Sequence, residues 1–132
     1  MSLLLLDTTF LVDTERGDVD LDDTIDDDDD VAIAAVTVAE LLVGARLASG
    51  KRRDARHDFV SEILESLPVI AYDGNVAVEH AELLVAVREQ GRPRGAHDLL
   101  IAATARATDR TIVTADRQAF TNLPGVVSVT HR

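Results

Sequence analysis

The stretch "LLLLDTTF" (Leu3–Phe10) decides the fold of this chain. Its four leucines form an apolar run that ends on a carboxylate, Asp7, and two threonines follow. A short apolar run bounded by polar residues predicts a buried strand. Because a lone buried carboxylate costs several kcal/mol unless a partner balances it, the position of Asp7 needs an explanation. Asp7 either caps the end of the strand or meets something cationic there.

The rest of the chain alternates further short apolar runs with helical patterns. A helical stripe of apolar residues follows Thr37, with Glu40 at the capping-box spacing from it, and Gly50 ends that helix. Such alternation predicts a parallel sheet covered by helices on both faces. We therefore expect a three-layer α/β/α sandwich with a central, mostly parallel sheet of about five short strands, in one domain over residues 1–132. The expected strands are 3–6, 31–37, 69–72, 111–116 and 126–129, and the expected helices are 10–15, 37–50, 52–66, 75–90, 97–109 and a short one near Phe120.

Composition narrows the class of protein. The net charge is −11, yet residues 13–30 hold eleven acidic residues and one arginine, so the remainder is close to balance. No segment is apolar for long enough to span a bilayer, and no basic region precedes the leucine run, so we expect a cytoplasmic protein without a membrane partner. An aspartate-rich chain whose one lysine is Lys51 fits a salt-rich cytoplasm, and we expect a halophilic archaeal source.

Four carboxylates are predicted to meet at one edge of the sheet. Asp7 and Asp116 each end a strand, Glu40 lies early in the helix after the second strand, and Asp98 opens the helix before the strand that ends at Asp116. Ligands of open parallel sheets bind at the carboxyl ends of the strands. Four converging carboxylates cannot all stay ionised without a cation, and oxygen ligands suit Mg²⁺ or Mn²⁺. With no cysteine and four scattered histidines, a zinc site is disfavoured.

Other polar residues have simpler interpretations. We interpret His80 and His97 as structural and Asp26–Asp30 as a solvated, self-repelling loop rather than a metal site. Arg92 and Arg94 are either surface charges or contacts to nucleic-acid phosphates.

Four segments together resemble the PIN-domain ribonucleases, and in particular the toxin half of VapBC-type toxin–antitoxin pairs. They are "LLLLDTTFLVD" (3–13), "VTVAELLVGA" (36–45), "RGAHDLLIAATA" (94–105) and "TADRQAF…LPGV" (114–126), in the order that the family has them. The resemblance implies that Asp7, Glu40, Asp98 and Asp116, here called the quartet, hold Mg²⁺, with Mn²⁺ as a substitute. Thr9 and Thr114 match positions that support the quartet by hydrogen bonds. Many members have Ser or Asn in place of Thr9, and the extra aspartate that some carry is absent at Gln118 and Ala119.

The resemblance also implies a reaction and partners. The expected activity is metal-dependent endoribonuclease cleavage of RNA that leaves a 5′-phosphate and a 3′-hydroxyl, with Asp7 and Asp98 as the direct metal ligands. The expected partners are the RNA substrate, a small cognate antitoxin protein and a second copy of the chain in a homodimer.

Three other functions use the same residues. In the first, a PIN nuclease acts in RNA maturation; in the second, the carboxylates are catalytically silent and the chain only binds RNA or an antitoxin. The third is phosphoryl transfer with Asp7 as nucleophile, as in receiver domains or haloacid-dehalogenase-like phosphatases. Those families need a late lysine or a second aspartate where this chain has Thr9, so the third alternative is the weakest.

Overall fold

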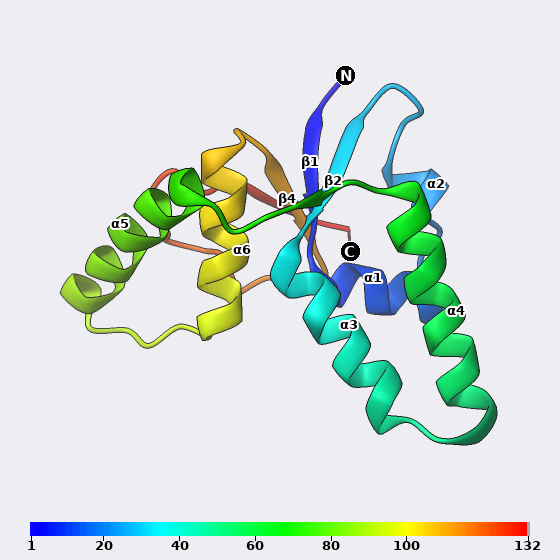
Figure 1. Ribbon diagram of the computed structural model, residues 1–132. Helices are drawn as coiled ribbons and strands as arrows, with labels where there is room; N and C mark the ends of the chain where they lie inside the picture. Colours follow the sequence, from blue (N-terminus) through cyan, green and yellow to red (C-terminus); the bar gives the residue numbers. More distant parts are fainter. Residues whose placement is uncertain (132) are drawn as a thin grey trace.

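The fold is built on a sheet of five parallel strands, as the alternation of elements predicts. The computed structural model describes residues 1–131, and the strand order is β3-β2-β1-β4-β5 (Figure 1). The leucine run lies at the centre of the sheet, where it pairs with β2 on one side and β4 on the other. The strands are β1 (Leu3–Leu6), β2 (Asp30–Ala34), β3 (Val69–Ile70), β4 (Thr111–Thr114) and β5 (Ser128–Thr130).

Helices cover both faces of the sheet and give the three layers that the sequence predicts. They are α1 (Thr8–Arg16), α2 (Leu21–Thr24), α3 (Ala35–Leu47), α4 (Gly50–Ser66), α5 (Gly74–Gln90) and α6 (Ala96–Ala107). Side chains of α5 and α6 pack with one face of the sheet, and those of α1, α3 and α4 pack with the other (Figure 1).

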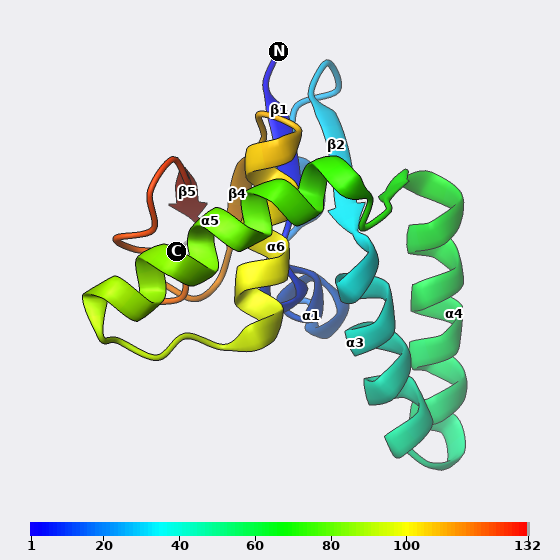
Figure 2. The ribbon, with the colours of Figure 1, turned by 60° about the vertical axis from the view of Figure 1, so that its left-hand side comes forward.

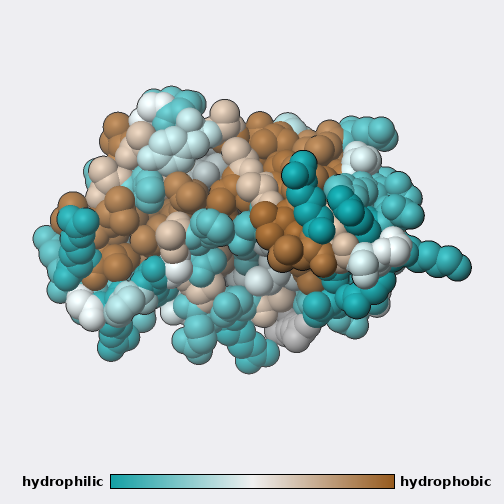
Figure 3. Space-filling model, turned by 60° about the horizontal axis from the view of Figure 1, so that its bottom comes forward, coloured by the Kyte–Doolittle hydropathy of each residue, from teal (hydrophilic) through white to brown (hydrophobic). Residues whose placement is uncertain are grey.

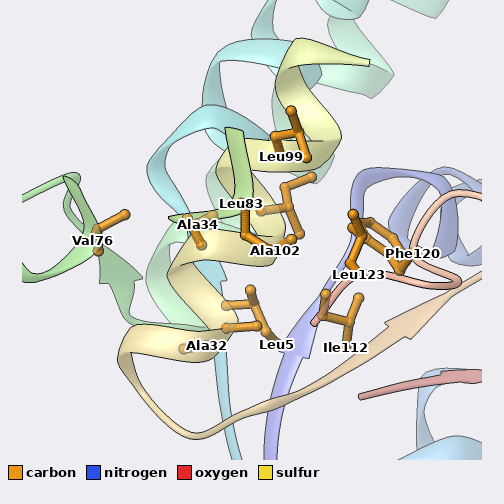
Figure 4. Packing of buried hydrophobic residues seen from close by; sticks show 13 residues of the cluster. Leu5, Ala32, Ala34, Val76, Leu83, Leu99, Ala102, Ile112, Phe120 and Leu123 are labelled. Atoms are coloured by element: carbon orange, nitrogen blue, oxygen red, sulfur yellow. The ribbon is translucent and has the colours of Figure 1, made fainter. Parts of the chain in front are cut away.

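The alternation of side chains along β1 explains how one strand contributes to the hydrophobic cores on both faces of the sheet. Leu5 lies in the cluster with α5 and α6, whereas Leu4 and Leu6 lie in the cluster with α1, α3 and α4. Successive strand residues point to opposite faces, so a run of leucines is required where both faces are buried. Figure 4 shows Leu5 and Ile112 from the sheet beside Leu83, Leu99 and Ala102 from the helices.

Helices α3 and α4 form a hairpin that projects from the carboxyl edge of the sheet (Figure 2). The hairpin arises because β2 leads directly into α3, and α4 returns the chain to β3. Gly50, at φ +59°, begins α4, so our expectation that it ends the preceding helix is wrong. A left-handed backbone of this kind favours glycine, and here it lies in the turn of the hairpin.

Several expected boundaries differ from the structure. β2 ends at Ala34 and α3 begins at Ala35, so Thr37 is a buried residue inside the helix and not its cap. α1 begins at Thr8, earlier than the expected start at residue 10, and Asp7 lies at its N-cap position. Residues near Phe120 form turns instead of a short helix. Across residues 1–131, no helix is long and apolar enough to cross a membrane.

Candidate active site

Asp7 occupies the end of β1 and is almost completely buried, with 2% of its surface exposed. Its side chain does not cap α1; instead its Oδ2 accepts hydrogen bonds from Thr9 Oγ1 at 2.8 Å and Thr114 Oγ1 at 2.7 Å. Its backbone N–H donates to Val113 O at 2.9 Å, which continues the pairing of β1 with β4. Within residues 1–131, no basic nitrogen lies within 4.0 Å of this carboxylate. The site therefore holds a buried carboxylate with hydrogen bonds but no cation.

Burial raises the pKa of Asp7 above its ordinary value of 3.8, and the negative charge of Glu40 raises it further. Hydrogen bonds from Thr114, Thr9 and the Thr8 backbone oppose this by stabilising the ionised form, yet the net direction is upward. Keeping the Asp7 carboxylate ionised therefore reduces the folding stability of the protein. A bound cation would offset this loss.

Thr9 of α1 and Thr114 of β4 meet around the Asp7 carboxylate. Their hydroxyls lie 3.2 Å apart, and Thr9 Oγ1 also accepts from the Ala115 backbone N–H at 3.0 Å. Thr114 Oγ1 in turn accepts from the Asp116 backbone N–H at 3.0 Å. These two threonines link Asp7 to the chain around Asp116, and the hydrogen bonds expected of them are present.

Glu40 lies on α3, in the second turn and not the first, because that helix begins earlier than expected. The capping box with Thr37 is therefore absent. Each oxygen of Glu40 has another partner: Oε1 accepts from Thr8 Oγ1 at 2.8 Å, and Oε2 lies 3.3 Å from His97 Nδ1. The position of Glu40 is fixed by residues from α1 and α6, which sequence spacing alone does not bring together.

Asp98 lies in the first turn of α6, whose N-terminus reaches the carboxyl edge of the sheet. Burial raises its pKa, and the charges of Asp7, Asp116 and Glu40 raise it further, while His97 lowers it. The negative charges of the three other quartet members thus all act on Asp98. The preceding Gly95 has no side chain, and a Cβ there would lie 3.0 Å from Asp98 Oδ2. A glycine at this position therefore leaves room for the Asp98 carboxylate at the N-terminus of α6.

Asp116 follows β4, and its side chain stabilises the turn that comes directly after it. Its Oδ1 accepts from the backbone N–H groups of Gln118 at 2.9 Å and Ala119 at 3.2 Å. One oxygen is thus occupied by the turn, as in an Asx-turn. Arg94 donates to the backbone oxygens of Ala119 and Thr121 in the same turn, so it is a structural residue and not a free surface charge.

A cavity of 330 Å³ is lined by three quartet members, Asp7, Glu40 and Asp98, but not by Asp116, and also by residues that the sequence analysis missed. Asp13 is 6% exposed and its Oδ2 lies 3.1 Å from His131 Nε2. The one hint to Asp13 in the sequence is that it lies within the quoted segment 3–13. His97, interpreted from the sequence as structural, faces Glu40 at the site. The lining residues are Asp7, Thr8, Thr9, Val12, Asp13, Arg16, Glu40 and Asp98.

The donor set of the quartet fits a divalent cation such as Mg²⁺ or Mn²⁺. The groups are carboxylate oxygens, the chain has no cysteine, and Asp7 is a buried acceptor with no cationic partner among residues 1–131. In the same residues, no three quartet carboxylates bring oxygens within 4.8 Å of one another. The quartet carboxylates therefore do not gather their oxygens as closely as a metal-bound cluster would, as expected of negative charges that repel each other.

A tighter acidic group lies at the opposite, amino edge of the sheet. Oxygens of Asp26, Asp28 and Asp29 approach within 4.8 Å of one another. Asp28 pairs with the N-terminal amine at 3.3 Å, and Asp29 accepts from the backbone N–H groups of Ser2 and Asp26. These contacts account for the packing of this loop, so the loop needs no ion to hold its shape.

Comparison with known proteins agrees with this geometry. The family model of the PIN domain matches residues 4–126. The chain is 33% identical to ribonuclease VapC5 of Mycobacterium tuberculosis, covering 95% of this chain and 90% of that protein. It is 32% identical to toxin FitB of Neisseria gonorrhoeae, covering 70% of this chain and 69% of that protein.

A solved structure extends the likeness to three dimensions. The structure of VapBC-5 from Mycobacterium tuberculosis, a member of the VapBC family of toxin–antitoxin systems, superposes with a TM-score of 0.79. It is 28% identical over 100% of this chain and 99% of that one. With a family match across most of its length, relatives above 30% identity and the five-stranded parallel sheet, this chain belongs to the PIN domain family.

Proposed function

We propose that this chain is a divalent-metal-dependent endoribonuclease and acts as the toxin of a toxin–antitoxin pair. The observation that carries the proposal is Asp7, a buried carboxylate that two threonines hold at the carboxyl edge and that has no basic side chain as a partner within residues 1–131. We also propose that residues 1–132 act as one PIN domain. Two relatives named ribonuclease and toxin support this assignment.

In this proposal, Asp7 and Asp98 hold the metal, for which Mg²⁺ is the preferred ion and Mn²⁺ a substitute. When bound, such an ion lowers the pKa of coordinated water and stabilises the leaving oxygen of a phosphodiester. Thr9 and Thr114 fix Asp7 Oδ2, so the ligand is oriented before the ion arrives. This pre-organisation reduces the cost of ordering the site on binding.

Glu40 and Asp116 are assigned to orienting groups around the scissile phosphate and to accepting the proton of the attacking water. Glu40 suits this role because both of its oxygens are already positioned, by Thr8 and His97. The expected products are a 5′-phosphate and a 3′-hydroxyl.

The decisive experiment is cleavage of a mixed RNA pool by purified protein with Mg²⁺, with Mn²⁺ and with EDTA. We expect cutting in both metals, none in EDTA, and at least a hundredfold loss in Asp7→Asn, on the order of the loss when an essential electrostatic group is removed. Asp29→Asn is the matched control, because Asp29 is an acidic residue at the other edge of the sheet. Cutting that ignores both metal and Asp7→Asn would indicate a contaminating nuclease.

If wild-type protein binds RNA but cuts none in any metal, the chain is a catalytically silent binding module instead. Binding of metal itself has a separate readout. Mn²⁺ should raise the midpoint of thermal unfolding of the wild type and leave Asp7→Asn nearly unchanged, because a ligand stabilises only the state that binds it.

We further propose that a small antitoxin protein and a second copy of this chain are its partners. The relative VapBC-5 belongs to a toxin–antitoxin family, which supports the first. Exposed apolar residues on α3 and α5, such as Leu47 at 82% and Val78 at 62% exposed, support an interface with another protein. Expression should arrest growth, and co-expression of the neighbouring small reading frame should restore it. Failure of that rescue would favour a role in RNA maturation, and light scattering would give the oligomeric state.

A further inference from the structure

Charge is distributed unevenly along the direction of the strands. The acidic segment 18–30 lies at the amino edge, where Ser2 and the N-terminus contact Asp29 and Asp28. The quartet lies at the carboxyl edge, and the α3–α4 hairpin projects from that same edge (Figures 1 and 2). A chain with a net charge of −11 nevertheless concentrates positive charge at the end of this hairpin.

We define the hairpin tip as Arg46, Lys51, Arg52 and Arg53. These four basic residues fall within eight consecutive positions, 46–53, and the tip includes the single lysine of the chain. All four side chains are exposed, and within residues 1–131 none lies within 4.0 Å of a carboxylate. Figure 3 shows hydrophilic side chains projecting around this face of the molecule, on its left, lower and right sides.

Several arginines elsewhere have structural partners that explain them. Arg56 donates to Gly44 O and pairs with Glu15, and Arg110 donates to Asp30 O at 2.8 Å. Arg106 pairs with Glu79 at 2.7 Å. The hairpin tip has no comparable contact in the described part of the chain. Its charges are therefore not needed to hold the fold together.

Two adjoining cavities lie between the quartet and the base of the hairpin tip. The cavity at the quartet shares Thr8, Val12, Arg16 and Glu40 with a second cavity of 170 Å³. That second cavity extends along α3 to Gly44, at the base of the tip. With a rise of 1.5 Å per residue, Arg46 lies about 9 Å beyond Glu40 along the helix axis. A strand bound at the quartet thus has a path towards the tip.

We propose that the hairpin tip binds the phosphate backbone of substrate RNA next to the scissile bond, an inference that rests on the proposed nuclease function. The quartet repels phosphate, so productive binding needs cations close by but outside the metal site. Unpaired Arg and Lys side chains supply such cations, and contacts to phosphates are the main source of sequence-independent affinity for nucleic acid. The acidic segment at the other edge disfavours RNA there, so the charge distribution directs RNA to the carboxyl edge.

The test compares two pairs of exposed arginines. Arg52→Gln/Arg53→Gln removes two charges of the tip, and Arg88→Gln/Arg92→Gln removes two at the end of α5, where no ion pair is formed in the described residues. All proteins carry Asp98→Asn to prevent cleavage. Binding of a fluorescein-labelled, 20-nucleotide single-stranded RNA is followed by anisotropy between about 50 and 500 mM KCl, the range in which such contacts weaken.

We expect the tip pair to weaken binding about tenfold near 100 mM KCl and to reduce the slope of log K against log[KCl] by about 1.4, or 0.7 per lost charge. The α5 pair should stay within twofold of the parent, which would make Arg92 a surface charge and not a contact to nucleic-acid phosphate, the two alternatives that the sequence leaves open. Arg52→Lys/Arg53→Lys should restore both affinity and slope, because it restores charge without restoring the guanidinium.

An unchanged affinity and slope in the tip pair would overturn the inference, as would an equal loss in both pairs. Loss of affinity for the antitoxin alone, with RNA binding intact, would also overturn it and assign the tip to the protein partner. The proposed nuclease function fails separately, if wild-type protein neither binds nor cuts RNA in the presence of Mn²⁺.

Discussion

Asp7 shows how a functional residue departs from what stability alone would select. It is buried, its pKa lies above the ordinary value, and the surrounding hydroxyls only partly offset the cost of burying its charge. A neutral side chain at this position would give the fold a higher free energy of unfolding. Substitutions that relieve such strain commonly add stability and remove activity.

The stability of Asp7→Asn should therefore exceed that of the wild type at neutral pH without metal, by about 1 kcal/mol. A carboxyl group whose folded pKa is raised contributes stability that is fully present below its unfolded pKa and is lost as pH rises through the folded pKa. The difference in free energy of unfolding between Asp7→Asn and the wild type should thus increase as the pH rises from below 3.8. Urea unfolding in EDTA between about pH 3.5 and 8 measures it.

Asp29→Asn is the control, because its pKa is shifted in the opposite direction: backbone hydrogen bonds from Asp26 and Ser2 lower the pKa of Asp29. It should not stabilise the protein at any pH in that range. A gap for Asp7→Asn that is constant with pH would show that titration of this carboxyl group does not cause the stabilisation.

Gly95→Ala is predicted to disturb Asp98 without disturbing the fold. The new Cβ would lie 3.0 Å from Asp98 Oδ2, so the carboxylate must move to accommodate it. A small displacement of a metal-site group commonly costs about tenfold or more in activity. RNA cleavage should fall by that amount, and the Mn²⁺ concentration needed for half-maximal stabilisation should rise.

Gly74→Ala is the matched control, because nothing lies within 4 Å of a Cβ at this helix start. Its cleavage rate should equal that of the wild type. Equal rates for the two glycine variants would mean that the Asp98 carboxylate does not need the space beside Gly95.

At the scale of elements, the junctions between strands and helices place the site. β1 passes into α1 through Asp7, β2 passes directly into α3, and β4 passes through Thr114 to Asp116. These three strands are neighbours in the sheet, so their carboxyl ends deliver groups to one place. α6 completes the site from its N-terminus, where an acidic residue also interacts favourably with the helix dipole.

Arg94→Ala should loosen the turn after Asp116, because Arg94 donates to the Ala119 backbone oxygen at 2.9 Å and also to that of Thr121. Loss of charged hydrogen bonds to backbone oxygens should cost about 1–3 kcal/mol. Hydrogen exchange should accelerate in the amides of residues 117–123.

Arg92→Ala is the control, since the side chain is exposed and forms no ion pair in the described residues. Its stability should lie within about 0.5 kcal/mol of the wild type. Comparable loss in both variants would assign the effect to net charge instead of to the contacts of Arg94.

At the scale of the molecule, the acidic segment 18–30 dominates the charge. The nine aspartates of this segment are mostly exposed and repel one another, and few interactions among the described residues oppose that repulsion. Salt shortens the range of such repulsion from about 10 Å at 0.1 M to 3 Å at 1 M. A salt-rich habitat remains a prediction that is based on this charge.

The unfolding midpoint should therefore rise by several degrees as KCl increases from about 0.1 to 2 M, where charge repulsion is screened. Replacing Asp26, Asp27 and Asp28 by Asn should reduce that rise. An equal rise in the triple variant would attribute the effect of KCl to hydrophobic contacts, which salts also strengthen, and would remove the basis for the expected saline habitat.

Some of this could be predicted from the sequence because it depends on local patterns. The apolar runs, the helical stripes and the aspartates that end β1 and follow β4 are readable within a few residues, and they predicted the parallel sheet. The start of α3 could not be read correctly, because Thr37 has the local signature of a cap although tertiary packing buries it against α1.

The sequence by itself determined the three-layer sheet, the acidic character of its carboxyl edge and the family. Only the tertiary structure decided that Thr8 and His97 hold Glu40, that Asp13 meets His131, and that the hairpin tip lies on the same side as the quartet. The physical reason is range. Strand and helix periodicity arises from neighbours along the chain, whereas these contacts join residues 32, 57 and 118 positions apart, which only the packing of helices on the sheet brings together.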